Sequence, residues 1–169
     1  GPQTEFLGAD EQEVLYGGAA GGGKSYALLA DFLRFADNPN SRGLLLRRTN
    51  DELKSLKQKA HQLYGAITFD GKKAVWREKA SEWLFPSGAT LWMAFLDRDD
   101  DVYRYQGQDF TWIGVDELTQ YASAFPWDYL RTRLRTDKDT GLQLYMRVTT
   151  NPGGPGHGWV KRYFIDPAP

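Results

Sequence analysis

Short apolar runs alternate with segments of helical periodicity over the first third of the chain. Residues 14–16 and 43–48 are apolar runs typical of buried strands. Each is followed by apolar residues at helical spacing. Thr49 or Asn50 can cap the second helix, because each has a side-chain oxygen that accepts from a backbone N–H. The expected order is strand 14–16, helix 26–36, strand 43–48 and helix 51–64, which is typical of a parallel sheet.

The middle of the chain has a different pattern. Four short apolar and aromatic runs are separated by turn signals, an Asp-Gly pair at 70–71 and a Pro-Ser-Gly run at 86–88. This pattern predicts an antiparallel meander that decorates one edge of the sheet. The runs are residues 67–69, 74–76, 83–85 and 90–93.

Buried-strand character returns after an acidic run at 97–101, which we expect to be a loop. Neither an internal repeat nor a domain linker is found in the sequence. We therefore expect a single α/β domain over residues 1–169, in which a mainly parallel central sheet is flanked by helices and carries an antiparallel β extension. The last expected segments are strand 110–115, helix 127–134, strand 142–149 and a turn-rich loop at 152–158.

Composition narrows the class of protein. The 169 residues include no cysteine, which excludes disulfides and thiolate metal sites. No apolar run approaches the roughly 20 residues of a membrane span, so we expect no membrane partner. The net charge of −1 argues against a chain coated in positive charge. Nucleic acid is not excluded, because a few Lys and Arg on one face can focus the potential locally.

A glycine-rich motif follows the first expected strand. Residues 18–25 satisfy G-x-x-x-x-G-K-[ST]. Glycines let backbone N–H groups point at phosphate oxygens, and the start of the next helix favours the same anion. Lys24 can reach the β- and γ-phosphates of ATP, and the Ser25 hydroxyl can bind Mg²⁺. The predicted phosphate-binding residues are Gly18, Ala19, Ala20, Gly21, Gly22, Gly23, Lys24 and Ser25.

Two carboxylates end the strand at 110–115. Asp116 and Glu117 are expected at the carboxyl edge of a parallel sheet, where α/β proteins bind ligands. Adjacent strand residues point in opposite directions, so the two need not share a task. We expect Asp116 to contribute to the Mg²⁺ shell and Glu117 to orient or deprotonate the attacking water. This pair favours an ATPase over a small-molecule kinase.

A third polar pair follows the expected strand 142–149. Thr150 and Asn151 have short polar side chains that can contact the γ-phosphate or the attacking water. Loss of those contacts on hydrolysis would act as a switch. Because the strand before them is expected beside the Asp116 strand, we expect both residues at the nucleotide.

Together these motifs resemble the large terminase subunit of tailed bacteriophages. The Tyr-Gln-Gly segment before the acidic strand and the Leu-Arg-x-Arg-Leu-Arg segment after it make the match more specific than the nucleotide motifs alone. The resemblance covers nearly the whole chain. Its segments are 3–7, 16–25, 46–49, 105–107, 116–117, 129–135 and 150–152.

The resemblance implies an ASCE-type P-loop NTPase domain that hydrolyses Mg-ATP. It also implies a homo-oligomeric ring that works in the host cytoplasm, at the viral portal and with the small terminase subunit, to thread double-stranded DNA into a capsid. Family members usually continue into a nuclease domain, which we expect to be absent from this chain. They also place an adenine-side glutamine before the first strand, a role that Gln3 would take.

Ring ATPases commonly complete each site with an arginine from the neighbouring subunit. Arg104 is the first candidate by its position relative to Asp116. An isolated domain is then expected to be a weakly active monomer, because that arginine is missing. Rival candidates are Arg47, Arg48, Arg133 and Arg135.

Other functions remain open at this stage. The alternatives are another P-loop DNA motor of helicase or recombinase type, a small-molecule kinase, and a module that binds nucleotide without turnover. A basic cluster at 131–138 is expected to be solvated surface rather than a DNA contact. His61 and His157 have no partner spacing that indicates zinc.

Overall fold

The computed structural model describes residues 13–16, 23–136 and 140–165. Its centre is a seven-stranded sheet in the order β1-β7-β6-β2-β5-β4-β3. Pairing is parallel from β1 to β5 and antiparallel from β5 through β4 to β3. The predicted α/β class, mainly parallel with an antiparallel extension, is confirmed. The strands are β1 (Glu13–Tyr16), β2 (Arg42–Arg47), β3 (Val75–Arg77), β4 (Glu82–Leu84), β5 (Thr90–Phe95), β6 (Trp112–Val115) and β7 (Tyr145–Thr149).

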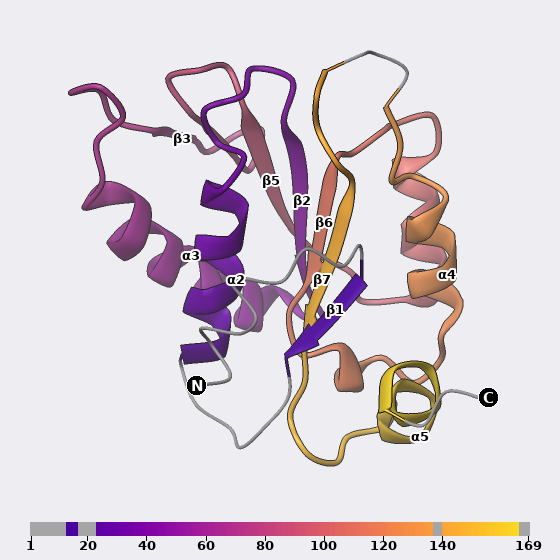
Figure 1. The fold of residues 1–169 in the computed structure, drawn as a ribbon. Coiled ribbons are helices and arrows are strands. Elements are labelled where there is room, and N and C mark those ends of the chain that lie inside the picture. Colours follow the sequence, from indigo (N-terminus) through magenta and orange to yellow (C-terminus); the bar gives the residue numbers. More distant parts are fainter. Residues whose placement is uncertain (1–12, 17–22, 137–139, 166–169) are drawn as a thin grey trace.

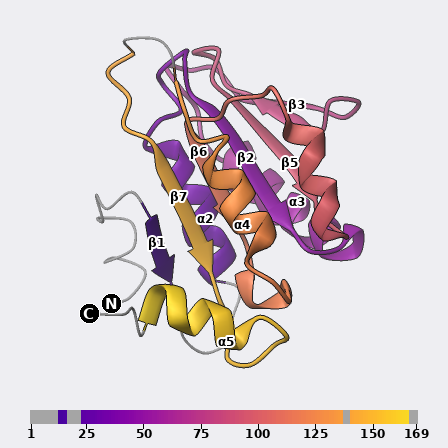
Figure 2. The same cartoon turned by 90° about the vertical axis from the view of Figure 1, so that its right-hand side faces the viewer.

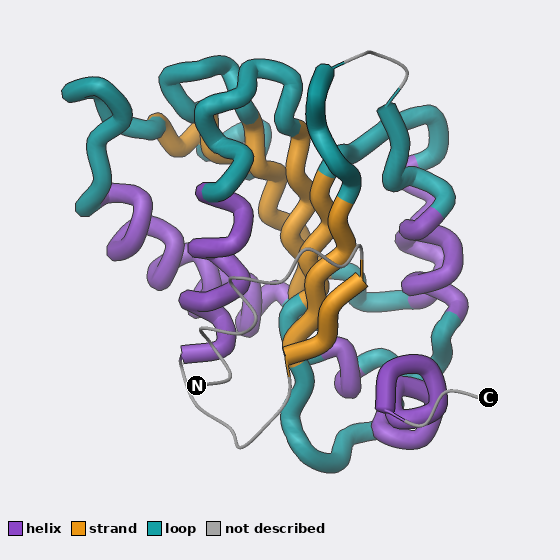
Figure 3. The backbone as a smooth tube through the Cα atoms, in the orientation of Figure 1, coloured by secondary structure: helices purple, strands orange, loops and turns teal. Residues whose placement is uncertain are grey.

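Helices cover both faces of this sheet (Figure 1). The longer helices, α2 (Gly23–Leu33) and α3 (Asn50–Gly65), lie on one face. The shorter α4 (Phe125–Arg131) and α5 (His157–Val160) lie on the other, and the turned view shows α4 in front of the sheet (Figure 2). The tube drawing shows the strands as the inner layer of this sandwich (Figure 3). Short helical segments complete the second face: η1 (Asp99–Tyr105), η2 (Leu118–Gln120) and η3 (Lys161–Ile165).

Alternating side chains of the strands form a core on each face. In β2, Leu45 packs in the cluster under α2 and α3, whereas Leu44 and Leu46 pack in the cluster under α4. All three are at most 1% exposed. A strand buried on both faces reads as a continuous apolar run, which is why this strand was visible in the sequence.

A buried ion pair joins α2 to β7. Asp31 and Arg147 are both fully buried, with 3.2 Å between Asp31 Oδ2 and Arg147 Nε. Trp112 Nε1 donates to the same carboxylate oxygen at 2.9 Å, and Arg34 lies 3.1 Å from the other oxygen. Burial lowers the pKa of the Arg147 guanidinium, and the Asp31 charge opposes that shift. The charges therefore compensate each other inside the core that α2 packs against.

Several expected elements need correction. Residues 67–69 form a single bridge, Phe69 with Lys72, because Asp70 and Gly71 both have positive φ and reverse the chain at once. The strand expected at 90–93 belongs to the central sheet, where it is parallel to β2 and antiparallel to β4. The acidic run at 97–101 enters η1 rather than remaining a loop, and its first turn is capped by the bond from Arg98 N–H to Asp101 at 2.9 Å.

The helix expected over 127–134 is shorter than predicted. It ends at Arg131 because the next residues pair with the backbone beside β6: Phe110 N–H donates to Arg133 O at 2.8 Å, and Arg135 N–H donates to Phe110 O at 3.0 Å. Within the described ranges, no helix has the length and apolar character needed to cross a membrane.

Candidate nucleotide-binding site

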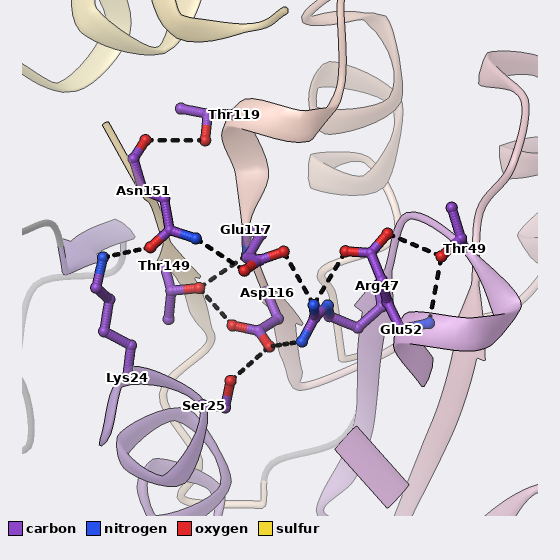
Figure 4. Close-up of polar contacts among 10 residues, drawn as sticks. All are labelled: Lys24, Ser25, Arg47, Thr49, Glu52, Asp116, Glu117, Thr119, Thr149 and Asn151. Carbon is purple, nitrogen blue, oxygen red and sulfur yellow. Dashed lines mark hydrogen bonds and ion pairs between the residues drawn. The ribbon is translucent and has the colours of Figure 1, made fainter. Parts of the chain in front are cut away.

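Polar side chains from the ends of three strands and the starts of two helices, α2 and α3, meet at one edge of the sheet (Figure 4). The parallel strands β2, β6 and β7 end at this edge, and α2 begins there. Carboxyl ends of parallel strands are the usual ligand-binding edge of α/β folds. The predicted neighbourhood of β6 and β7 is confirmed by their pairing, from Trp112 with Tyr145 to Val115 with Val148.

Lys24 and Ser25 lie in the first turn of α2 and are both 6% exposed. The Lys24 ammonium donates to the backbone oxygen of Thr150 and, at 2.8 Å, to Oδ1 of Asn151. Burial lowers the pKa of Lys24, while the charges of Glu117 and Asp116 oppose that shift. A buried ammonium is thus held at the end of β7 by oxygen acceptors.

Asp116 is the most enclosed carboxylate of the cluster, with 1% exposure. Its Oδ2 accepts from Ser25 Oγ at 2.8 Å and from Arg47 Nη1 at 2.8 Å, and its Oδ1 accepts from Thr149 Oγ1. A hydroxyl and a carboxylate side by side offer the hard oxygen ligands that Mg²⁺ prefers. The donor set of Ser25 and Asp116 therefore fits that ion.

Glu117 follows Asp116 in a left-handed backbone conformation, with φ 58° and ψ 58°. Its N–H donates to Thr149 Oγ1 at 2.8 Å. Its carboxylate accepts from Asn151 Nδ2 at 2.8 Å and from Arg47 Nη2 at 2.9 Å. The expectation that Asp116 and Glu117 point apart is wrong here: β6 ends at Val115, the turn at Glu117 replaces strand alternation, and both carboxylates contact Arg47.

The pKa of the Glu117 carboxyl is raised. Burial is the largest cause; Arg47 opposes it, while Glu52 and Asp116 add to it. Burial also acts to raise the pKa of Glu52, but hydrogen bonds from Thr49 and Arg47 outweigh it, so that pKa is lowered. Of the two carboxylates that share Arg47 Nη2, Glu117 is therefore the better proton acceptor.

Arg47 lies inside the cluster of its own chain, which the sequence did not predict. It was named as a rival arginine for a neighbouring subunit, yet its side chain is 9% exposed and contacts three carboxylates of its own chain. Glu52, the third of them at 3.0 Å, was expected only as part of a helix start. The sequence did contain a pattern that places Glu52 beside Thr49, because Thr49-x-x-Glu52 has the capping-box spacing. Thr49 Oγ1 accepts from Glu52 N–H at 3.2 Å and donates to its carboxylate at 2.8 Å.

Of the two residues after β7, Asn151 reaches the cluster through its side chain, whereas Thr150 does so through its backbone. Asn151 joins Lys24 to Glu117 through its two amide atoms, and its backbone oxygen accepts from Thr119 Oγ1 at 3.2 Å. Thr150 contributes its backbone oxygen to Lys24, while the neighbouring Thr149, not singled out from the sequence, bonds Asp116 and Glu117.

The remaining predicted residues lie elsewhere or outside the description. Arg104 lies in η1 with its side chain 40% exposed, 3.8 Å from Asp101 and 3.5 Å from the carbonyl of Phe95. These contacts do not include the Lys24–Glu117 cluster. Gly23 begins α2. The residues outside the described ranges are Gln3, Gly18, Ala19, Ala20, Gly21 and Gly22.

This mainly parallel sheet between helical layers, with the cluster at its carboxyl edge, defines the P-loop NTPase class of α/β fold. The family model "Terminase large subunit, T4likevirus-type, N-terminal" matches residues 15–164. The chain belongs to this terminase family.

Solved structures agree with this assignment at the level of the fold. The large terminase of a thermophilic bacteriophage aligns with TM-score 0.73 and 15% identity, over 98% of this chain and 42% of that one. The same terminase in complex with ADP gives 0.71 and 14%, with the same coverage. The N-terminal domain of the DNA packaging ATPase from bacteriophage phi29 gives 0.55 and 16%, over 88% and 80%. The chain thus spans less than half of the thermophilic-phage terminase. Curated protein sequences gave no match.

Proposed function

We propose that this chain is the ATP-hydrolysing motor domain of a phage DNA-packaging terminase, with residues 1–169 forming one domain. The observation that carries the proposal is a single hydrogen-bonded network at the carboxyl edge of the sheet, in which Arg47 joins two groups: Lys24, Asn151 and Glu117 on one side, and Asp116 and Ser25 on the other. The network brings together a cation that can bind phosphate, oxygen ligands that can bind a metal ion, and a carboxylate that can accept a proton from water.

Lys24 and the start of α2 bind the phosphates in this proposal. The ammonium exchanges the oxygens of Thr150 and Asn151 for phosphate oxygens, and the N-terminus of α2 adds backbone donors. Gly18 to Gly23 would line the phosphates, and Gln3 the adenine. Ser25 and Asp116 would hold Mg²⁺, which when bound neutralises charge that develops on the phosphate oxygens.

Glu117 accepts a proton from the attacking water. Arg47 and Asn151 orient its carboxylate. Because Asn151 also bonds Lys24, loss of the γ-phosphate changes the surroundings of Asn151 and shifts the segment after β7. This supplies a route from hydrolysis to movement. Unchanged DNA-stimulated turnover in Asn151→Ala would contradict it.

The partners follow from the family. Packaging is the activity named for the similar phi29 ATPase, and ADP is bound by the similar thermophilic-phage terminase. We propose double-stranded DNA as the transported polymer and a homo-oligomeric ring, with Arg104 completing the neighbour's site. The portal and the small terminase subunit are the proposed viral partners, and the host cytoplasm is the proposed location.

Replacement of Lys24 by alanine tests nucleotide use. We expect Lys24→Ala to lose Mg-ATP affinity and phosphate release by at least about tenfold, because one charged phosphate contact contributes about 1.5–3 kcal/mol. The matched control is Lys72→Ala, an exposed lysine in the turn that follows α3, which should behave as the native chain. Binding and phosphate release are measured separately across protein concentration.

The same assay discriminates the alternatives. A ring ATPase gains turnover per subunit as concentration rises, because subunits supply Arg104 to one another. A kinase would bind ATP and release phosphate only through an acceptor, and a binding module would bind without turnover at any concentration. Native-like ATP binding by Lys24→Ala would overturn the proposed site itself.

The pH dependence of phosphate release follows from the Glu117 environment. Only the ionised carboxylate accepts a proton, and its pKa is raised, so turnover should fall on the acid side at a higher pH than an ordinary glutamate gives. Arg47→Gln should move this acid-side fall in turnover (the acid limb) to a still higher pH, because the Arg47 cation, which favours ionisation of Glu117, is removed. Initial rates at saturating Mg-ATP between about pH 4 and pH 8 measure it. A limb that stays in place, or moves down, would rule out Glu117 as the titrating base.

A further inference from the structure

Positive charge is concentrated in one segment of the chain. Residues 53–80 hold seven Lys and Arg against two Asp and Glu, a formal net charge of +5, although the whole chain carries −1. This segment runs from the first turn of α3 to just past the end of β3. β3 is the edge strand of the sheet, α3 covers one face of the sheet, and Figure 1 shows both away from α4 and α5.

The helix and the strand form one continuous surface. The rings of His61 in α3 and Trp76 in β3 lie 5.6 Å apart, and Lys57 Nζ lies 5.4 Å from the Trp76 ring centroid. At the far end of the helix, Lys73 Nζ donates to Gly65 O at 2.6 Å. Basic side chains therefore flank a partly exposed aromatic seam. The group that we name the α3–β3 basic face consists of Lys54, Lys57, Lys73, Arg77 and Lys79.

Little of this charge is neutralised within the fold. Lys54 lies 3.9 Å from Asp51 with its side chain 69% exposed, and Arg77 lies 3.1 Å from Glu82 with 46% exposed. Across the described residues, Lys57 and Lys79 have no carboxylate within ion-pair distance. Lys73 also has no carboxylate within that distance, so three of the five cations in this mostly exposed cluster are without an ion pair among the described residues. Such a cluster raises the local potential and attracts a polyanion.

We propose that the α3–β3 basic face binds the phosphate backbone of double-stranded DNA. The choice of DNA as the polyanion rests on the proposed function. A regular row of phosphates suits lysines, which act as point charges and carry no sequence preference. The 16-residue helix α3 is about 24 Å long, enough for its basic side chains to follow several phosphates.

The position of this face relative to the catalytic cluster favours it over the basic residues near α4. Glu52, in the first turn of α3, lies 3.0 Å from Arg47, and Arg47 lies 2.9 Å from Glu117. One rigid helix therefore carries DNA-facing lysines along its length and a site carboxylate at its start. Force on bound DNA is applied to an element that contacts the hydrolytic site.

Removal of three charges tests the proposal on the whole chain. The variant Lys54→Gln, Lys57→Gln, Lys79→Gln is compared with Arg131→Gln, Arg135→Gln, Arg162→Gln, which removes the same charge on the opposite side of the sheet. Binding of a labelled duplex of about 30 base pairs is measured by anisotropy across a salt series, without nucleotide. A third variant, Lys54→Arg, Lys57→Arg, Lys79→Arg, keeps the charge.

We expect the first variant to lose at least tenfold in affinity at low salt. Its plot of log affinity against log salt should be shallower by about 0.9 for each phosphate contact removed. The opposite-side variant should stay within about twofold of the native chain, and the arginine variant should bind as the native chain does. Circular dichroism and nucleotide binding show that each variant is folded.

Three results would overturn the proposal. Equal loss in both triple variants would mean that binding follows net charge rather than this face. Native-like DNA binding by the first variant would place the contact elsewhere, and binding of polyglutamate but not of duplex DNA would assign the face to an acidic protein. The DNA-binding assay contains no nucleotide. Its result can therefore be interpreted even if the chain proves not to hydrolyse ATP.

Discussion

Glu117→Gln is expected to bind Mg-ATP normally and to release phosphate about 10²–10⁴-fold more slowly than the native chain, the usual contribution of a positioned base. The amide keeps the size of the side chain, and its one oxygen can still accept from either Arg47 or Asn151, which in Glu117 donate to different oxygens. It cannot take a proton from water. Nucleotide binding and single-turnover phosphate release, measured at the same protein concentration, separate the two effects.

The matched control is Glu78→Gln, an exposed glutamate on the turn after β3. It should retain native turnover, because an amide oxygen can still accept from Trp76 Nε1 as Glu78 does. Turnover of Glu117→Gln within threefold of the control would remove Glu117 from the proton-transfer role. Loss of nucleotide binding in the same variant would instead show that the substitution disturbs the phosphate site.

Asp31→Ala should produce the largest loss of stability, about 3–5 kcal/mol, the usual cost of leaving one member of a buried ion pair without its partner. Arg147 is fully buried beside Asp31, and Trp112 loses its acceptor in the same change. For a chain of this size, the midpoint of thermal unfolding should fall by about 6–20 °C, at about 2–4 °C for each kcal/mol lost. Denaturant and thermal unfolding, followed by circular dichroism, measure it.

The double variant Asp31→Leu, Arg147→Met separates charge from packing. Because it removes both charges, we expect it to recover most of the lost stability, as apolar replacement of a buried pair often does. Asp37→Ala, at an exposed position just after α2, should unfold at the native midpoint. If the double variant is less stable than Asp31→Ala, the pair stabilises the core by geometry that apolar side chains cannot replace.

The sequence predicted those parts of the fold that depend on local pattern. The buried strand β2 has a continuous apolar run, and the amphipathic helix α3 has apolar residues at helical spacing. Thr49 and Asn50 were both candidates for the cap of α3, and the structure has Thr49 in that position. The role of β5 was not visible. A strand paired in parallel on one side and antiparallel on the other has no pattern of its own that distinguishes it from a meander strand.

The candidate site was predicted as a set of residues but not as a geometry. Lys24, Ser25, Asp116, Glu117 and Asn151 converge, because motifs at the ends of adjacent parallel strands must meet at one edge. The contact of both carboxylates with Arg47 depends on the left-handed turn at Glu117, a non-glycine residue for which the sequence gives no warning. A buried arginine among acids is likewise a product of tertiary packing.

The oxygens at the end of β7 that bond Lys24 compete with a bound phosphate for the same ammonium group. Any phosphate that recruits Lys24 must first displace the oxygens of Thr150 and Asn151, so nucleotide affinity is the difference between two sets of bonds rather than the sum of new ones. In the proposed ATPase, the same exchange would keep the buried cation compensated when product leaves. The oxygens at the end of β7 would then favour release of product, and the strength of their bonds to Lys24 would affect how long product remains bound.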